Sequence, residues 1–381
     1  MVEKSCINKI CKDFDLPFMA DENNFMDILQ EYSDAIPTHS EEWKNIHTAK
    51  YLATKMFGLD PELRKIGFGA DILFKLINDF IHYMWTSMTG GYNAEAKLIY
   101  DSFNSVDINK KYPIEKINVP SGDVYNMSNV GKKFISVDMS KAAYQAMYFD
   151  CPRVLDNMPT WEAYVSHMFV WFKTKVENSP AEVMNSVPCG IEEIFQHSGK
   201  VADFIIEYTT ASRQIRQVVF GKTNGARLCH IEKYVMQKWV YKNVIENCPG
   251  AVAVKFCNDE VIFEYEDGLA EKIEEILPKF FKFKVETFTV EGMNIIQIIT
   301  DDGGETVSTS SQNGIMIRQR IDGCPNFSFK CCPSILRYFA NSFMTNNTPI
   351  NAENINPVFR RIEVNGFVTQ LVGTFGFTRQ L

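Results

Sequence analysis

The chain lacks the patterns that would place it in a membrane or in the secretory pathway. It has no run of 18 apolar residues, so no transmembrane helix is expected. Residues 1–19 have no apolar core like that of a secretory signal peptide. The 10 cysteines form no C-x-x-C pair and the 6 histidines do not cluster with them, which argues against a zinc site. We therefore expect a cytoplasmic protein with free thiols.

The motifs of several enzyme classes are also missing. The sequence has no G-x-S-x-G nucleophile elbow and no Gly-rich P-loop, and we expect no proofreading exonuclease in so short a chain. Basic residues are in the minority, since 39 Lys and Arg stand against 47 Asp and Glu, giving a net charge of −8. This balance argues against a protein that coats nucleic acid over its whole surface, but it leaves room for a local basic channel.

What is present is an ordinary globular composition, with 45% hydrophobic and 23% charged residues in 381. That length predicts two or three domains, or one catalytic unit with subdomains. Apolar residues at three- and four-residue spacing predict helices through much of residues 22–105, and a connector rich in Pro and Gly follows at 106–131.

The pattern changes after residue 131. KKFISVDMS predicts a strand that ends at Asp138, and AVAVKF–CNDE–VIFEY predicts a hairpin with Asp259 in its turn. A helix and a strand follow, and the residues between Asp138 and the hairpin are mostly helical. The order over 132–290 predicts an α+β fold with a ferredoxin-like βαββαβ sheet. Such a sheet brings the end of its first strand beside the turn of its hairpin.

Three acids in these segments are candidate catalytic and metal-binding residues: Asp138, Asp259 and Glu260. Two carboxylates from separate strands can hold a pair of divalent ions, which activate a hydroxyl and stabilise a leaving pyrophosphate. Each acid also has a purely structural explanation. Asp138 can cap the next helix, and acidic residues are common in hairpin turns.

A basic segment lies between the strand and the hairpin. Residues 213–243 contain seven basic residues and one acid, Glu232, in a chain of negative net charge. Arg213 and Arg216 share a helix face, and Gly221 and Gly225 predict a loop just before a long helix, where backbone N–H groups can meet phosphate. The alternative is a solvated basic helix face.

Together the three segments resemble motifs A, B and C of right-hand, palm-domain nucleic-acid polymerases, in the usual chain order. VDMSKAAYQAM is similar to motif A, RQVVFGKTNG to motif B and KFCNDEVIFEY to motif C. The residues of these motifs are most similar to those of family-A polymerases, but Asn258 and Arg216 stand where that family has His and Lys. The short gap between motifs B and C is closer to viral RNA-dependent RNA polymerases and reverse transcriptases.

The resemblance implies a template-directed polymerase that uses two Mg²⁺ or Mn²⁺ ions held by the three acids. Arg216 would then contact the triphosphate and Phe220 would stack near the base. Ala143, five positions after Asp138, would leave room for a ribose and so favours ribonucleotides. The full set of nucleotide-binding residues implied by the resemblance is Arg213, Arg216, Phe220, Gly221, Lys222 and Asn224.

The resemblance also implies three regions and a set of partners. Residues 1–130 would form helical fingers or a support, 131–300 the palm with fingers helices inserted at 150–225, and 301–381 a small thumb-like region. The partners would be a nucleic-acid template and primer, nucleoside triphosphates, and other viral or replication proteins, with no membrane. The setting would be the host cytoplasm or a virion.

Two other functions stay open at this point. A nucleotidyl cyclase of palm fold is one, because its Gly-Gly-Asp-Glu-Phe hairpin resembles CNDEV. The other is a non-catalytic viral structural or interaction protein, in which the acids are only turn residues.

Overall fold

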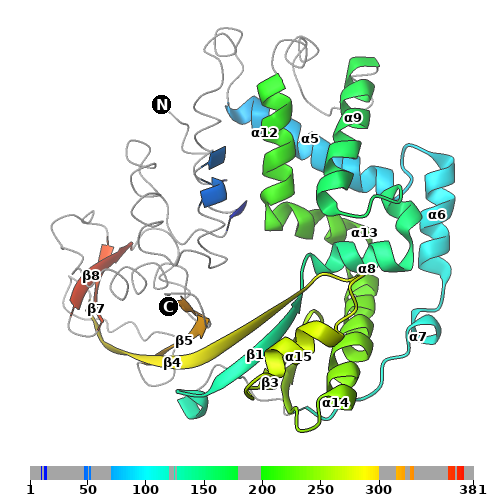
Figure 1. Cartoon of the computed structure of the whole chain (residues 1–381). Helices are drawn as coiled ribbons and strands as arrows, with labels where there is room; N and C mark the ends of the chain where they lie inside the picture. The colour runs from blue at the N-terminus through cyan, green and yellow to red at the C-terminus, as the bar shows by residue number, and fades with distance from the viewer. Residues whose placement is uncertain are drawn as a thin grey trace.

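The computed structural model describes residues 10, 13–14, 47–49, 51–52, 70–119, 124, 127–178, 199–299, 315–321, 327–329, 359–364 and 367–372. These parts combine helices with an antiparallel sheet, which confirms the predicted α+β class (Figure 1). A search of the same ranges finds no helix with the length and apolar character needed to span a bilayer.

The sheet is built around β1 (Lys133–Met139), which runs antiparallel to both of its neighbours. On one side lies β3 (Glu260–Glu264), followed by β2 (Ala253–Phe256), and on the other lies β4 (Phe283–Ile299). The strand order is therefore β2-β3-β1-β4, and the hairpin, the strand of Asp138 and the final strand all form where the alternating sequence predicts them.

The last strand is longer than expected. The sequence predicts one strand after the helix that follows the hairpin, and this strand, β4, continues to Ile299. Beyond β1 it pairs with β5 (Ile315–Ile321) and β7 (Phe359–Val364), and these pair in turn with β6 (Phe327–Phe329) and β8 (Phe367–Val372) (Figure 1). Sheet pairing thus crosses residue 300, where the palm and thumb-like regions were predicted to meet, and the rest of that C-terminal region lies outside the described residues.

Helices fill most of the remaining described chain. Before the sheet come α5 (Ala70–Met88), α6 (Ala94–Ser105), α7 (Ile108–Lys111) and the short η1 (Met127–Asn129). Between β1 and β2 come α8 (Ala142–Asp150), η2 (Pro152–Leu155), α9 (Trp161–Asn178), α12 (Gly199–Ala211), α13 (Arg213–Val235), the π-helix η3 (Met236–Lys242) and α14 (Asn243–Asn247). Helix α15 (Leu269–Ile276) connects β3 to β4.

The two faces of β1 have different surroundings, because successive side chains of a strand point to opposite sides. Ile135, Val137 and Met139 are buried in the main hydrophobic core with residues of the helices. Phe134 belongs to a second, smaller cluster with Phe288 of β4, on the other face. Asp138 shares the face of Phe134, so the strand directs its acid away from the helical core.

Helix α13 corrects one prediction. Residues 221–225, expected to form a loop, lie within a helix that is kinked at Asn224, whose φ is −145° and ψ is 77°. The Asn224 Oδ1 accepts from the Arg227 N–H at 3.1 Å, so Asn224 caps the second half of the helix. The carbonyl of Thr223 accepts from the Tyr100 hydroxyl at 2.9 Å, which satisfies a group that the kink would otherwise leave open.

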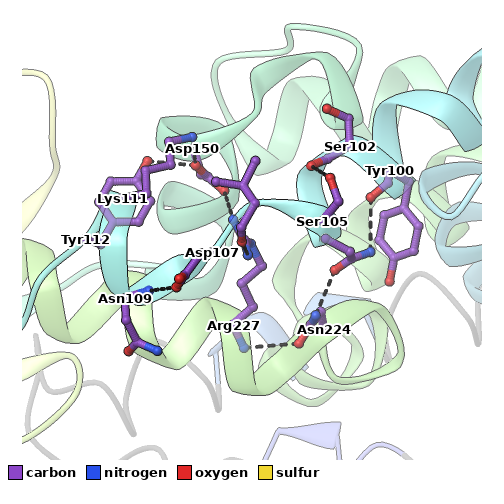
Figure 2. A network of polar contacts seen from close by, with 12 residues as sticks. Tyr100, Ser102, Ser105, Asp107, Asn109, Lys111, Tyr112, Asp150, Asn224 and Arg227 are labelled. Atoms are coloured by element: carbon purple, nitrogen blue, oxygen red, sulfur yellow. Dashed lines mark hydrogen bonds and ion pairs between the residues drawn. The ribbon is translucent and has the colours of Figure 1, made fainter.

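A buried ion pair joins α8 to α13 (Figure 2). The Asp150 carboxylate lies 3.4 Å from Arg227 Nη2, and these side chains are 1% and 6% exposed. Asp150 also accepts from the Tyr112 hydroxyl at 2.7 Å and from Lys111. Arg227 donates to the Val106 carbonyl at 2.8 Å. The network fixes the helix that follows Asp138 against the helix that carries Arg216.

The predicted connector is attached along α13 and η3. The His230 ring lies 2.8 Å from the carbonyl of Tyr112. The Gln237 amide makes two bonds to the backbone of Glu115, accepting from its N–H at 2.9 Å and donating to its carbonyl at 2.7 Å. Lys242 forms an ion pair of 2.7 Å with the Glu115 carboxylate. The described part of the connector around Tyr112 and Glu115 therefore packs along α13 and η3.

Candidate active site

The pairing of β1 with β3 brings the two predicted acid-bearing segments together. Asp138 lies opposite Glu260 in the register, and the Met139 N–H donates to the Asp259 carbonyl at 2.8 Å. The hairpin turn is therefore beside the end of β1, as the βαββαβ order predicts. Asp138 and Asp259 are both half-buried, so each is partly accessible to solvent.

The Glu260 carboxylate has two close partners within the sheet. It accepts from the Ser136 hydroxyl at 2.8 Å and lies 3.6 Å from Lys255 Nζ. Ser136 and Glu260 are neighbours on the same face of the sheet as Asp138. The contacts give Glu260 a clear structural role in fixing β1, β2 and β3 to one another, beside any auxiliary role at a cation.

A further acid, Glu232 of α13, adds to this group. Its side chain is buried, and burial together with the charge of Asp259 raises its pKa to about 7, while the Cys229 thiol has the opposite, smaller effect. Glu232 is the single acid of the basic segment, and it shares a helix face with buried Leu228 and Val235. The sequence signal for Glu232 is an acidic residue at a position of the long helix where the three- and four-residue spacing calls for an apolar one.

The raised pKa of Glu232 predicts a pH-dependent effect of Glu232→Gln. The protonated form is favoured in the fold, so the wild-type protein loses stability as pH rises from about 4.5, the ordinary value, to about 7. A shift of this size corresponds to at most about 3 kcal/mol. Urea denaturation should show the variant more stable than wild type at pH 8 and nearly equal at pH 4.5. Glu271→Gln, on the exposed side of α15, is the control and should show no such gain.

Three basic side chains gather at the same end of β1. Lys141, three residues after Asp138, adopts a left-handed backbone conformation with φ of 53°. Partial burial and then the charges of Arg216 and Lys282 lower its pKa to about 8. Its ammonium group also forms an ion pair with the Glu162 carboxylate. Lys282 precedes β4, and its carbonyl accepts from the Ser140 N–H at 3.0 Å. We call Lys141, Arg216 and Lys282 the basic trio.

The predicted nucleotide-binding residues are thus divided. Arg216 belongs to the basic trio and also donates to the Thr210 carbonyl at 3.0 Å. Arg213 and Lys222 are exposed on α13. Phe220 is 3% exposed and packs against Tyr144 and Trp161, so its ring is a core element in this conformation and does not present a face to a base.

The remaining motif B residues lie within α13 and not in the phosphate-binding loop that the sequence pattern predicts. Asn224 caps the second half of the helix and makes a bond of 2.7 Å to the Asn104 side chain (Figure 2). Gly221 and Gly225 have open space where a Cβ would stand, so the local structure gives no reason for glycine at these two positions.

The donor chemistry at the end of β1 and at the hairpin suits a hard divalent cation. Carboxylate oxygens are the protein ligands that Mg²⁺ and Mn²⁺ prefer. The charge of Asp259 contributes to the raised pKa of Glu232, and a bound cation would relieve this like-charge repulsion. Within the described ranges, however, no three His, Cys, Asp or Glu side chains lie close enough together to form a metal-binding cluster.

Comparison with known proteins adds no assignment. No protein-family model, no curated protein and no solved structure matches this chain. The functional interpretation therefore depends on the residues of the site and on the resemblance of its three motifs.

Proposed function

We propose that this chain is a palm-type nucleotidyltransferase that extends a nucleic-acid strand along a template. One observation carries the proposal: the antiparallel pairing of β1 and β3 sets Asp138 beside the turn of Asp259. These acids belong to the segments that resemble motifs A and C. The strand order β2-β3-β1-β4 and the helical insertion between β1 and β2 agree with a palm and inserted fingers.

In this proposal the acids and the basic trio have separate tasks. Asp138 and Asp259 would hold Mg²⁺ or Mn²⁺, and Glu232 would add negative charge behind Asp259. When bound, such ions supply activation of the attacking hydroxyl and neutralisation of the leaving pyrophosphate. Lys141, Arg216 and Lys282 would hold the triphosphate at the end of β1, where their charges already influence one another.

The surroundings of α8 support a ribonucleotide as substrate. Ala143 is small and half-buried, and it stands at the position where a bulky side chain would exclude a 2′ hydroxyl. The next residue, Tyr144, is 3% exposed, and its hydroxyl donates to the Met158 carbonyl at 2.6 Å. Since that ring is held in the core, Tyr144 does not replace Ala143 as a barrier to ribose.

The basic trio predicts different effects for two basic residues of α13. Arg216→Gln removes a charge next to Lys141, so we expect the KM for the nucleoside triphosphate to rise about tenfold with a smaller change in kcat. Lys233→Gln, at an exposed position of the same helix, is the control and should change KM less than twofold. Steady-state incorporation kinetics measure both, and equal KM values for the two variants would contradict the assignment of the trio.

Primer extension by the purified chain tests the proposed function directly. RNA and DNA templates are each combined with ribonucleotides and deoxyribonucleotides, in the presence of Mg²⁺ or Mn²⁺. We expect template-dependent extension that is faster with ribonucleotides. A cyclic dinucleotide as product would indicate the cyclase instead, and the absence of any nucleotide transfer would favour a non-catalytic viral structural or interaction protein.

A further inference from the structure

We propose that Phe280 and the aromatic and basic side chains around it form a platform on which single-stranded RNA stacks as it enters or leaves the proposed active site. The platform consists of Lys238, Trp239, Lys279, Phe280 and Lys282. It lies where η3 meets the segment between α15 and β4. Its link to catalysis depends on the proposed function, whereas its ability to bind RNA can be tested without it.

The platform is centred on an aromatic ring that the fold leaves open. Phe280 is 64% exposed, although its neighbour Phe281 is buried and packs against Phe149 at 5.2 Å between ring centroids. The Trp239 ring meets Phe280 edge to face, with centroids 5.5 Å apart and planes at 89°. Phe281 therefore anchors the segment in the core, while Trp239 supports the exposed Phe280 ring from one side.

Positive charge surrounds these rings. Lys238 Nζ lies 4.7 Å from the centroid of Trp239. The segment 277–285, LPKFFKFKV, contains three lysines and no acid, in a chain whose net charge is −8. Exposed aromatic rings flanked by lysines are what a single strand needs, because each base can stack on a ring while its phosphate meets a cation.

The platform is continuous with the proposed active site. Lys282 belongs to both, since its charge acts on Lys141. Its N–H donates to the Gln145 side chain at 2.7 Å and its carbonyl accepts from the Ser140 N–H at 3.0 Å. Phe280 lies two residues before Lys282 in the chain, which places the ring of the platform next to the basic trio in sequence. Because Ala143 leaves room for the ribose of the incoming nucleotide, the strand that the proposed site would make is RNA.

Phe280→Ala tests the platform by fluorescence anisotropy with a labelled 12-nucleotide RNA of low structure. We expect RNA affinity to fall about tenfold, since one base-stacking ring is lost. Phe280→Tyr keeps a flat ring and should bind within twofold of wild type. Leu98→Ala, at a 70% exposed apolar position of α6, is the control for lost apolar surface and should have no effect. Wild-type RNA affinity in Phe280→Ala would overturn the proposal. The absence of RNA binding by the wild-type protein would overturn it as well.

Two further measurements separate this inference from the proposed function. The charge-removing pair Lys279→Gln and Lys282→Gln should reduce the salt dependence of RNA binding, because fewer counterions are released. RNA affinity should stay within twofold of wild type in Asp259→Asn, which removes the proposed catalysis. Binding that depends on Phe280 without any nucleotide incorporation would support the platform and refute the polymerase. Nucleotide incorporation by the wild type, together with unchanged RNA binding in Phe280→Ala, would support the polymerase and refute the platform.

Discussion

Asp138→Asn and Asp259→Asn are each expected to lower nucleotide incorporation about 10³-fold or more. Each change removes a carboxylate that would hold a divalent ion while keeping the size of the side chain. Losing that stabilisation of the transition state by several kcal/mol corresponds to a rate effect of this order. Because both acids are only half-buried, the substitutions should leave the fold intact. Single-nucleotide incorporation under saturating substrate measures the loss, and circular dichroism checks the fold.

Asp101→Asn is the matched control for both variants. Asp101 lies on α6, its side chain is 55% exposed, and it pairs with Lys97 four residues earlier. Its replacement should leave incorporation unchanged. Mg²⁺ provides a second measurement, since a ligand that binds the folded state raises the unfolding temperature. That increase should occur in the wild type and in Asp101→Asn and disappear in the two active-site variants. Full incorporation by Asp259→Asn would refute the assignment of the site.

The second large effect is expected at Asp150. Asp150→Asn should destabilise the fold by about 3–5 kcal/mol, because it leaves the buried guanidinium of Arg227 without its counter-charge. The Arg227 side chain is only 6% exposed and lies 4.7 Å from the Phe103 ring, so little water can reach it to replace the carboxylate. Urea denaturation measures the change. Asp101→Asn again serves as the control, with an expected effect below about 0.5 kcal/mol for an exposed pair.

A paired substitution distinguishes this explanation from simple loss of packing. Asp150→Leu combined with Arg227→Met removes both charges and keeps apolar volume. If the cost of Asp150→Asn comes from the unpaired cation, the double variant should be more stable than the single one. A double variant that is as unstable as Asp150→Asn would show that the remaining partners, Lys111 and Tyr112, carry the effect instead.

The sequence was most informative where local pattern and tertiary structure agree. The apolar run before Asp138 and the two β-rich runs around Asn258 predict a strand and a hairpin, and the structure has both. Their pairing followed from the βαββαβ order. These elements bury one face each in the same core, so the hydrophobic pattern that selects the strand also selects its orientation.

Prediction from the sequence was weaker where a side chain far along the chain decides the outcome. At the kink of α13, the Thr223 carbonyl accepts from Tyr100 and the Asn224 amide donates to Asn104, and no local pattern of α13 contains these two partners. Lys141 and Lys282 join Arg216 only because β4 pairs with β1. The raised pKa of Glu232 comes from its burial and from the nearby charge of Asp259, and spacing along the chain shows neither.

The length of β4 has a consequence for shortened versions of this chain. Its first part pairs with β1, whereas residues from Phe288 onward pair with β5 and then with β7. A fragment that stops near residue 300 would retain the acids but leave one side of β4 without hydrogen-bonding partners. Unpaired edge strands of this kind can form hydrogen bonds with the edge strands of other molecules. Self-association of such a fragment would then interfere with any activity assay, so biochemical work should retain the segments that form β5, β6, β7 and β8.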